Sequence, residues 1–117
     1  MKTTKVTPKQ FIQALSVLRS QTRSNIEANQ ITALMRLREA GEGGLSVGEV
    51  GDAVGITHVS ASRMVRVLGC HGLKANKESG WGVVEIYYDH TRPRATMARL
   101  NKKGIKAVDD FLEMLSN

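Results

Sequence analysis

The sequence predicts a mainly α-helical α+β domain with one small β-hairpin, and three observations lead to this prediction. Apolar residues recur at helical spacing near both ends of the chain. Two short helical patterns share the segment 46–68, where a glycine separates them. A β-rich run over 83–88 is followed by a turn and a returning strand, which together make a hairpin over 83–100. We treat residues 1–117 as a single domain, because a chain of this length suits one core.

The composition indicates a globular protein of a reducing compartment. Apolar residues make up 41% of the chain and charged residues 24%, which is typical of folded domains. The single cysteine, Cys70, cannot close a disulfide within the chain. No apolar run approaches membrane-spanning length, and no apolar signal segment follows the first five residues. We therefore expect a cytoplasmic protein without a membrane partner.

The positive charge is concentrated in less than half of the chain. The formal net charge is +6. Residues 58–106 contain ten lysines and arginines against three acidic residues, a net charge of +7, so the remaining residues carry a net charge of −1. A charge gathered in this way is typical of a surface that faces a polyanion. Solubility alone is the other explanation for a basic excess.

Capping residues mark the helices at the two ends of the chain. Thr7 is placed to cap a first helix, and Gln10 completes a capping box with it. Asn101 is placed to cap the last helix. The apolar positions that these two helices repeat are Phe11, Ile12, Leu15 and Leu18 in the first, and Ile105, Val108, Leu112 and Leu115 in the last. The helices predicted outside the centre of the chain are 7–19, about 29–40 and 102–116.

The segment 46–68 has the spacing of a helix-turn-helix. Ser46 and Glu49 form a capping box that opens its first helix. Gly51 is small at the position where the two helices approach most closely, and Gly55 supplies the positive φ that the turn needs. Thr57 is placed to cap the second helix. The positions that should be buried are all apolar: Val50, Val54, Ile56, Ala61 and Met64. An ordinary helix pair with a glycine between the helices is the alternative.

The second helix of this unit turns a polar face outward, as a DNA-reading helix does. Side chains that donate or accept hydrogen bonds at base edges and phosphates are expected on that face. A helix-turn-helix that binds protein instead of DNA stays open as an alternative. The candidate DNA-binding residues of this segment are Thr57, His58, Ser60, Ser62, Arg63 and Arg66.

The hairpin over 83–100 follows the second helix directly and has a basic tip. Arg92 and Arg94 flank Pro93, which stiffens the turn. The planar guanidinium of arginine suits phosphates and narrow minor grooves. A solvated turn is the alternative for the tip. With the segment 46–68, this hairpin predicts a winged helix-turn-helix, in which Arg92 and Arg94 are candidate DNA contacts.

From about residue 30 onward the chain resembles the MarR family of bacterial regulators. The resemblance runs through the segments 55–57, 60–63 and 82–85, then the arginine-bearing tip, and ends with Arg-Leu-Asn-Lys-Lys-Gly over 99–104. It implies a DNA-binding regulator, a dimer made by the terminal helices and a small-molecule effector, although no residue pattern here supports an effector. The chain departs from the family at three places: its wing has Arg92 where the family has an aspartate, its loop over 70–80 is longer, and it has room for one C-terminal helix instead of two. A short, divergent member encoded by a phage or plasmid fits these departures.

No residue pattern indicates an enzyme, so we expect no catalytic residue, no metal site and no cofactor. The histidines, His58, His71 and His90, lack metal-ligand spacing with one another and with Cys70. Cys70 is either a small structural residue or a redox switch of the kind known in the resembled family. Trp81 either anchors the wing to the core or stacks on a ligand.

Two lysines at the start of the last helix are further candidate DNA contacts. Lys102 and Lys103 occupy its first turn, where the helix dipole disfavours positive charge. A nearby phosphate backbone explains them, and a salt-bridged partner surface is the alternative.

The function that the sequence predicts is regulation of transcription. We expect a sequence-specific regulator that binds double-stranded DNA, with repression expected rather than activation. It would act as a nucleoid-associated homodimer on a palindromic site. The terminal helices would form the dimer, unless they only cover their own domain. The rival functions are a winged-helix module that binds another protein and a non-specific architectural DNA-binding protein.

Overall fold

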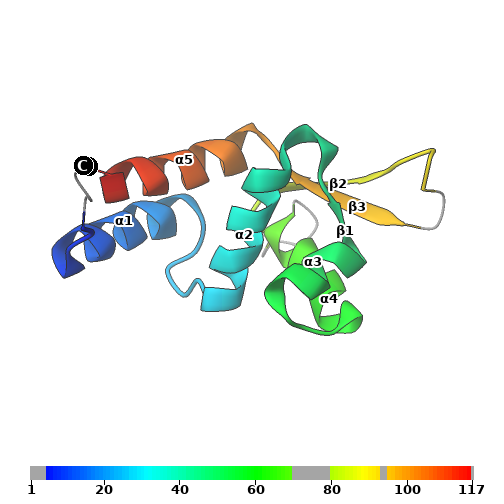
Figure 1. The fold of residues 1–117 in the computed structure, drawn as a ribbon, viewed down its shortest axis with the longest axis horizontal. Helices are drawn as coiled ribbons and strands as arrows, with labels where there is room; N and C mark the ends of the chain where they lie inside the picture. The colour runs from blue at the N-terminus through cyan, green and yellow to red at the C-terminus, as the bar shows by residue number, and fades with distance from the viewer. Residues whose placement is uncertain (1–4, 70–79, 93–94, 117) are drawn as a thin grey trace.

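The computed structural model describes residues 5–69, 80–92 and 95–116, which contain five α-helices and a small three-stranded sheet (Figure 1). This is the α+β architecture that the sequence predicts. In chain order the elements are α1 (Pro8–Gln21), α2 (Ala28–Ala40), the 3-10 turn η1 (Gly41–Gly43), β1 (Leu45–Ser46), α3 (Val47–Val54), α4 (His58–Leu68), β2 (Val84–Tyr88), β3 (Thr96–Leu100) and α5 (Lys102–Ser116).

The helices begin where local side chains satisfy the free N–H groups of the first turn. Thr7 accepts a hydrogen bond from the Gln10 N–H at 3.1 Å, and the Gln10 side chain accepts one from the Thr7 N–H at 2.9 Å. Ser46 accepts from the Glu49 N–H at 3.1 Å in a second capping box. Asn101 accepts from the Gly104 N–H at 2.9 Å. These caps are confirmed, while α1 continues two residues beyond the predicted 7–19.

The helix-turn-helix packs through the two glycines that its spacing requires. A Cβ at Gly51 would lie 3.0 Å from the Ile56 carbonyl oxygen and 3.4 Å from the Ala61 Cβ, so α3 and α4 approach closely at this point. Gly55 follows α3 with φ +87°, in the left-handed region that favours glycine. Both of these sequence predictions are confirmed.

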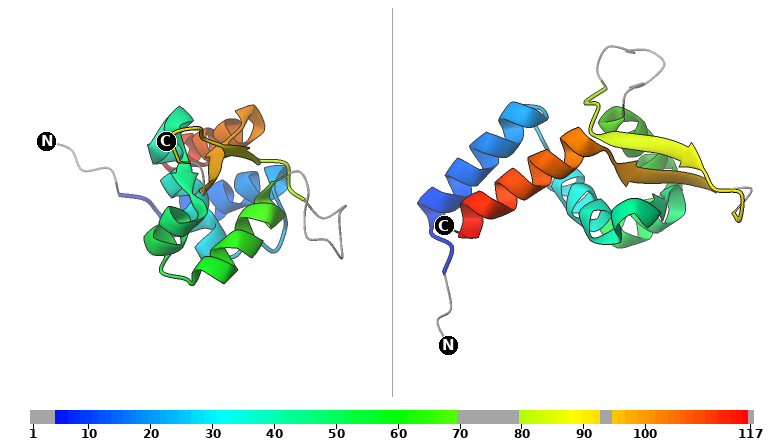
Figure 2. Two further views of the ribbon diagram at one scale, coloured as in Figure 1. Left: turned by 90° about the vertical axis from the view of Figure 1, so that its right-hand side faces the viewer. Right: turned by 90° about the horizontal axis from the view of Figure 1, so that it is seen from above.

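The sheet is antiparallel with the strand order β1-β3-β2. In the hairpin Val84 is paired with Leu100 and Tyr88 with Thr96, so the strands run outward from the domain to the wing tip (Figure 2). Strand β1 was not predicted. It has only two residues, and Leu45 of β1 pairs with Ala98 of β3, 53 positions further along the chain. No local sequence pattern therefore predicts it.

The terminal helices α1 and α5 lie side by side at the end of the molecule opposite the wing (Figures 1 and 2). Leu18 of α1 and Val108 and Phe111 of α5 are buried between them and the rest of the core. The Phe11 ring meets the Phe111 ring edge to face, with 6.5 Å between centroids. The two helices therefore cover a large part of each other within one chain.

The wing is fixed to the core at its base. Trp81 is buried in the main core cluster, which agrees with the anchoring role that its sequence position suggests. Gly104 of α5 packs directly on the Val83 carbonyl oxygen, where a Cβ would collide with it. The wing base and the first turn of α5 therefore touch backbone to backbone.

Two features are absent from the described residues, a membrane-spanning helix and a cluster of metal-ligating side chains. No helix there is both long and apolar enough to cross a membrane. Within the same residues, no three His, Cys, Asp or Glu side chains gather into a group that could hold a metal ion. Cys70 and His71 lie outside the described residues.

Candidate nucleic-acid interface

Helix α4 buries one face and exposes the opposite one. Ala61, Val65 and Leu68 lie in the core, at the spacing of four and three that places residues on one side of a helix. Most of the sequence-predicted residues of this segment are on the other side or at its edge. Exposed are Thr57, His58, Ser60, Arg63 and Arg66, and Ser62 is half-buried.

The two arginines of α4 differ from Arg38, Arg92 and Arg99, which pair with carboxylates of other elements. Within the part of the chain that the structure describes, neither Arg63 nor Arg66 pairs with a carboxylate. Arg38, by contrast, makes two hydrogen bonds to Asp109, at 2.8 and 3.2 Å. The pair holds the pKa of Asp109 below its ordinary value. Helix α4 thus presents positive charge that nothing in its described surroundings neutralises, as an anion-binding surface requires.

Hydroxyl groups at the start of α4 take part in hydrogen bonds within the helix. The Thr57 hydroxyl accepts a hydrogen bond from the Ser60 N–H at 3.1 Å and donates one to the Ser60 Oγ at 3.0 Å. Thr57 therefore acts as the predicted cap. The Ser60 hydroxyl still has its own proton to donate outward.

A hollow of about 270 Å³ lies between α4 and the wing. His58 and Ser62 of α4 line one side of it, and Ala95 and Thr96 at the outer end of β3 line another. Ser46, Val47 and Gly48, at the start of α3, complete the lining. The structure therefore places two of the predicted α4 residues, His58 and Ser62, beside the base of the wing tip.

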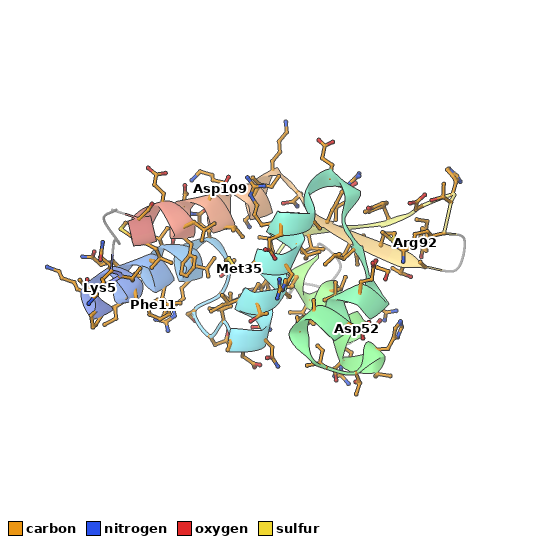
Figure 3. The ribbon with its side chains drawn as sticks, viewed as in Figure 1. Lys5, Phe11, Met35, Asp52, Arg92 and Asp109 are labelled. Carbon is orange, nitrogen blue, oxygen red and sulfur yellow. The ribbon has the colours of Figure 1, made fainter. Side chains whose placement is uncertain are left out.

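Arg92 lies on the wing (Figure 3) and is held by an acidic residue of α3. Its Nη1 is 2.9 Å from the Glu49 Oε1, and the same oxygen accepts the Ser46 N–H at 2.8 Å. The Ser46 N–H, and next the Arg92 guanidinium, hold the pKa of Glu49 below its ordinary value. The sequence suggested Glu49 only as a capping residue, because its partner lies 43 positions away.

Asp89 makes local hydrogen bonds at the start of the wing tip. Its carboxylate accepts the Thr91 N–H at 2.9 Å and the Thr91 hydroxyl at 2.8 Å. These bonds lower the pKa of Asp89 and shape the turn. The other wing arginine, Arg94, lies outside the described residues.

Lys102 and Lys103 lie away from the wing tip: they follow the inner end of β3, while the tip precedes its outer end. The Lys103 Nζ donates to the Trp81 carbonyl at 3.1 Å, and the next lysine of the helix, Lys106, pairs with Asp110 at 2.6 Å. Partners within the chain thus account for part of the charge pattern of α5.

A second hollow, of about 520 Å³, lies between the end of α2, the inner part of the sheet and the start of α5. Arg99 forms one wall, where it makes a two-bond pair with Glu85, at 3.1 Å each, and stacks 4.3 Å from the centre of the Tyr87 ring. The Tyr87 hydroxyl donates to the Gly43 carbonyl at 2.8 Å. Sequence reasoning missed this cluster, because it joins residues of three elements.

The helix-turn-helix, the sheet and the hairpin define a winged helix-turn-helix protein. The same fold is found in MepR of Staphylococcus aureus, solved in complex with DNA, which is 21% identical over 92% of this chain and 77% of MepR, with a TM-score of 0.69. It is found in Rv1404 of Mycobacterium tuberculosis, at 19% identity over 88% of this chain and 61% of Rv1404, with a TM-score of 0.65. BpsR of Bordetella bronchiseptica is 18% identical over 92% of this chain and 69% of BpsR, with a TM-score of 0.57.

These three proteins are MarR-family regulators, so the resemblance noted in the sequence is matched by the fold. No protein-family model matches the sequence, and neither does any curated protein.

Proposed function

We propose that the protein is a sequence-specific regulator of transcription that binds double-stranded DNA. In this proposal it represses transcription and acts as a homodimer on a palindromic site. The observation that carries this proposal is the outer face of α4, where Arg63 and Arg66 are exposed and lack partners among the described residues. The similarity of the fold to that of MepR, which was solved with DNA, supports it.

In this proposal α4 enters the major groove. Its first turns would contact base edges through Ser60, Ser62 and Arg63, while Arg66 and His58 contact phosphates or bases. The wing would follow the backbone or the minor groove through Arg92 and Arg94. Because Arg92 is already held by Glu49, its guanidinium would reach DNA without a large loss of side-chain freedom. Lys102 and Lys103 lie at the other end of β3 from the wing tip, so any phosphates that they contact would lie away from those at the tip.

The proposed dimer would use the apolar side chains that α1 and α5 leave uncovered. Phe11, Ile12 and Leu112 are 45%, 64% and 43% exposed, respectively. A second copy that covers them by two-fold symmetry would set two α4 helices roughly 34 Å apart, one turn of DNA. Such spacing matches a palindromic site.

A small-molecule effector is a subordinate part of this proposal, supported by the hollow of about 520 Å³. A volume of this size is typical of small-ligand sites. Residues of α2, β3 and α5 line it, so an occupant would contact both the wing base and the helix that leads to the proposed dimer interface. The structure of BpsR concerns regulation of its DNA binding by 6-hydroxynicotinic acid.

The test of the main proposal is a selection of bound sequences from random duplexes, followed by affinity measurements at several salt concentrations. We expect an enriched palindrome and a steep fall of affinity with salt, because bound arginines release counterions from DNA. Salt-sensitive binding without an enriched sequence would favour the architectural alternative. Failure to bind any duplex would favour the protein-interaction module.

A further inference from the structure

Val59 is an apolar side chain at the start of the exposed face of α4. It is 70% exposed, although valine is usually buried in folded domains. Arg63 follows it after four positions and Arg66 after seven, so the three side chains form one ridge along the helix. The buried side chains of α4, such as Ala61 and Val65, lie on the other side.

The isolated chain gains little from a valine at this position. Val59 packs on no part of the core that the described residues form, and a β-branched residue is a weaker helix former than alanine. It occupies the second position of α4, after the Thr57 cap. In helix-turn-helix proteins the residues at the start of the second helix are those that reach base edges. A contact outside the chain would explain an aliphatic side chain here.

We propose that Val59 packs against the C5-methyl group of a pyrimidine, thymine in unmodified DNA, in the major groove. That methyl group is the apolar feature that a base pair presents in this groove. The two exposed arginines on the same ridge give the charge complementarity that would bring a duplex to this face. The inference rests on the proposed function and adds to it one base preference in each half-site and the residue that sets it.

The test uses the full-length protein and the duplex enriched in the selection. Each thymine is replaced singly by deoxyuridine, which keeps base pairing but lacks the methyl group. At one thymine in each half-site we expect a loss of affinity of about threefold to tenfold, the size expected for one buried methyl group. In Val59→Ala this difference between thymine and deoxyuridine should vanish. The matched control is Val6→Ala, which removes a 48% exposed valine outside α4 and should keep the wild-type difference.

A further arm separates the two sources of the methyl group. The sensitive base pair is changed to C·G, with either cytosine or 5-methylcytosine, and we expect 5-methylcytosine to bind more tightly than cytosine to the wild type but not to Val59→Ala. A site without any deoxyuridine-sensitive thymine, or a Val59→Ala variant that retains the full difference, would overturn the inference and leave the proposed function intact. Failure of the wild type to bind every duplex would overturn both. Alanine is the better helix former, so Val59→Ala should fold, and thermal unfolding by circular dichroism checks this.

Discussion

At the scale of the residue, some arginines pair with carboxylates of the same chain, and others are exposed without such a partner among the described residues. Arg38 and Arg99 each make paired hydrogen bonds to a carboxylate of another element. Arg63 lies exposed on α4 without such a partner among the described residues. An exposed charge contributes little to the stability of the chain. Its contribution should therefore appear in binding.

Arg63→Ala should reduce affinity for the selected site by about 1–3 kcal/mol and relax the preference for one base pair, because a bidentate arginine contact to guanine is lost. Affinity is measured by fluorescence anisotropy on the selected duplex and on single-base variants of it. Arg36→Ala is the control, since Arg36 is paired with Glu39 on α2. An equal loss on every sequence would make Arg63 a phosphate contact, and no loss would contradict the role of α4.

Glu49 combines two structural roles in one carboxylate. It closes the capping box of α3 and holds Arg92 of the wing, and both contacts lower its pKa. A carboxyl with a lowered pKa in the folded state contributes stability above its unfolded pKa of about 4.3, and loses this contribution as the pH falls through the folded pKa.

Glu49→Gln should flatten the loss of stability at acid pH. Glutamine can still close the capping box, so α3 should keep its cap, while the charge that binds Arg92 is gone. The free energy of unfolding is measured by urea titration at intervals between pH 6 and pH 3. We expect it to fall less steeply in the variant than in the wild type. The same slope in both proteins would contradict the role of Glu49.

At the scale of the element, one glycine decides how α5 meets the wing. Gly104 lies in the first turn of α5, directly against the Val83 carbonyl. A Cβ added at this position would collide with that carbonyl and would lie 3.0 Å from the Leu100 side chain. The obstacle is backbone, which cannot move aside as a flexible side chain can. Any side chain at position 104 must therefore push the helix away from the base of the wing.

Gly104→Ala should lower the free energy of unfolding by about 1–3 kcal/mol, the usual effect of overpacking. The matched control is Gly48→Ala in α3, where an added Cβ would meet its nearest neighbour at an ordinary 3.7 Å. That change should leave stability unchanged or raise it by up to about 1 kcal/mol, because alanine is the better helix former. Chemical denaturation followed by circular dichroism compares the two. A stable Gly104→Ala protein would show that α5 can shift freely.

At the scale of the whole molecule, the two ends of an elongated chain differ in character. Its principal extents are 46, 34 and 25 Å. Arg92 lies at the wing end and Phe11 at the end that α1 and α5 form (Figure 3). One end therefore carries the wing with Arg92, and the other offers exposed apolar side chains.

Ile12→Glu with Leu112→Glu should convert a dimer into monomers of 12.8 kDa, because the charges would be buried in the interface. Both side chains are exposed in the chain, so its own core should tolerate the change, whereas Leu115 packs on that core and is left intact. The control places the same charges on α2, as Asn29→Glu with Thr32→Glu. Light scattering at micromolar concentration gives the molar mass. A wild type that is monomeric both free and on its DNA site would contradict the dimer.

Features that depend on neighbours within a few positions could be predicted from the amino-acid sequence. The caps at Thr7, Ser46 and Thr57 and the turn at Gly55 follow from side-chain and backbone chemistry over one helical turn. The apolar spacing then set which face of α4 is buried. For this reason the helix-turn-helix and its outward polar face could be predicted in detail.

Contacts between distant segments of the chain depend on tertiary packing. The pairing of β1 with β3, the ion pair of Glu49 with Arg92 and the separation of Lys102 from the wing tip all depend on how the elements pack. These contacts join residues tens of positions apart, and the energy that selects them comes from burying the whole core at once. The sequence therefore predicted the parts of the interface, and packing decided which of them share one surface.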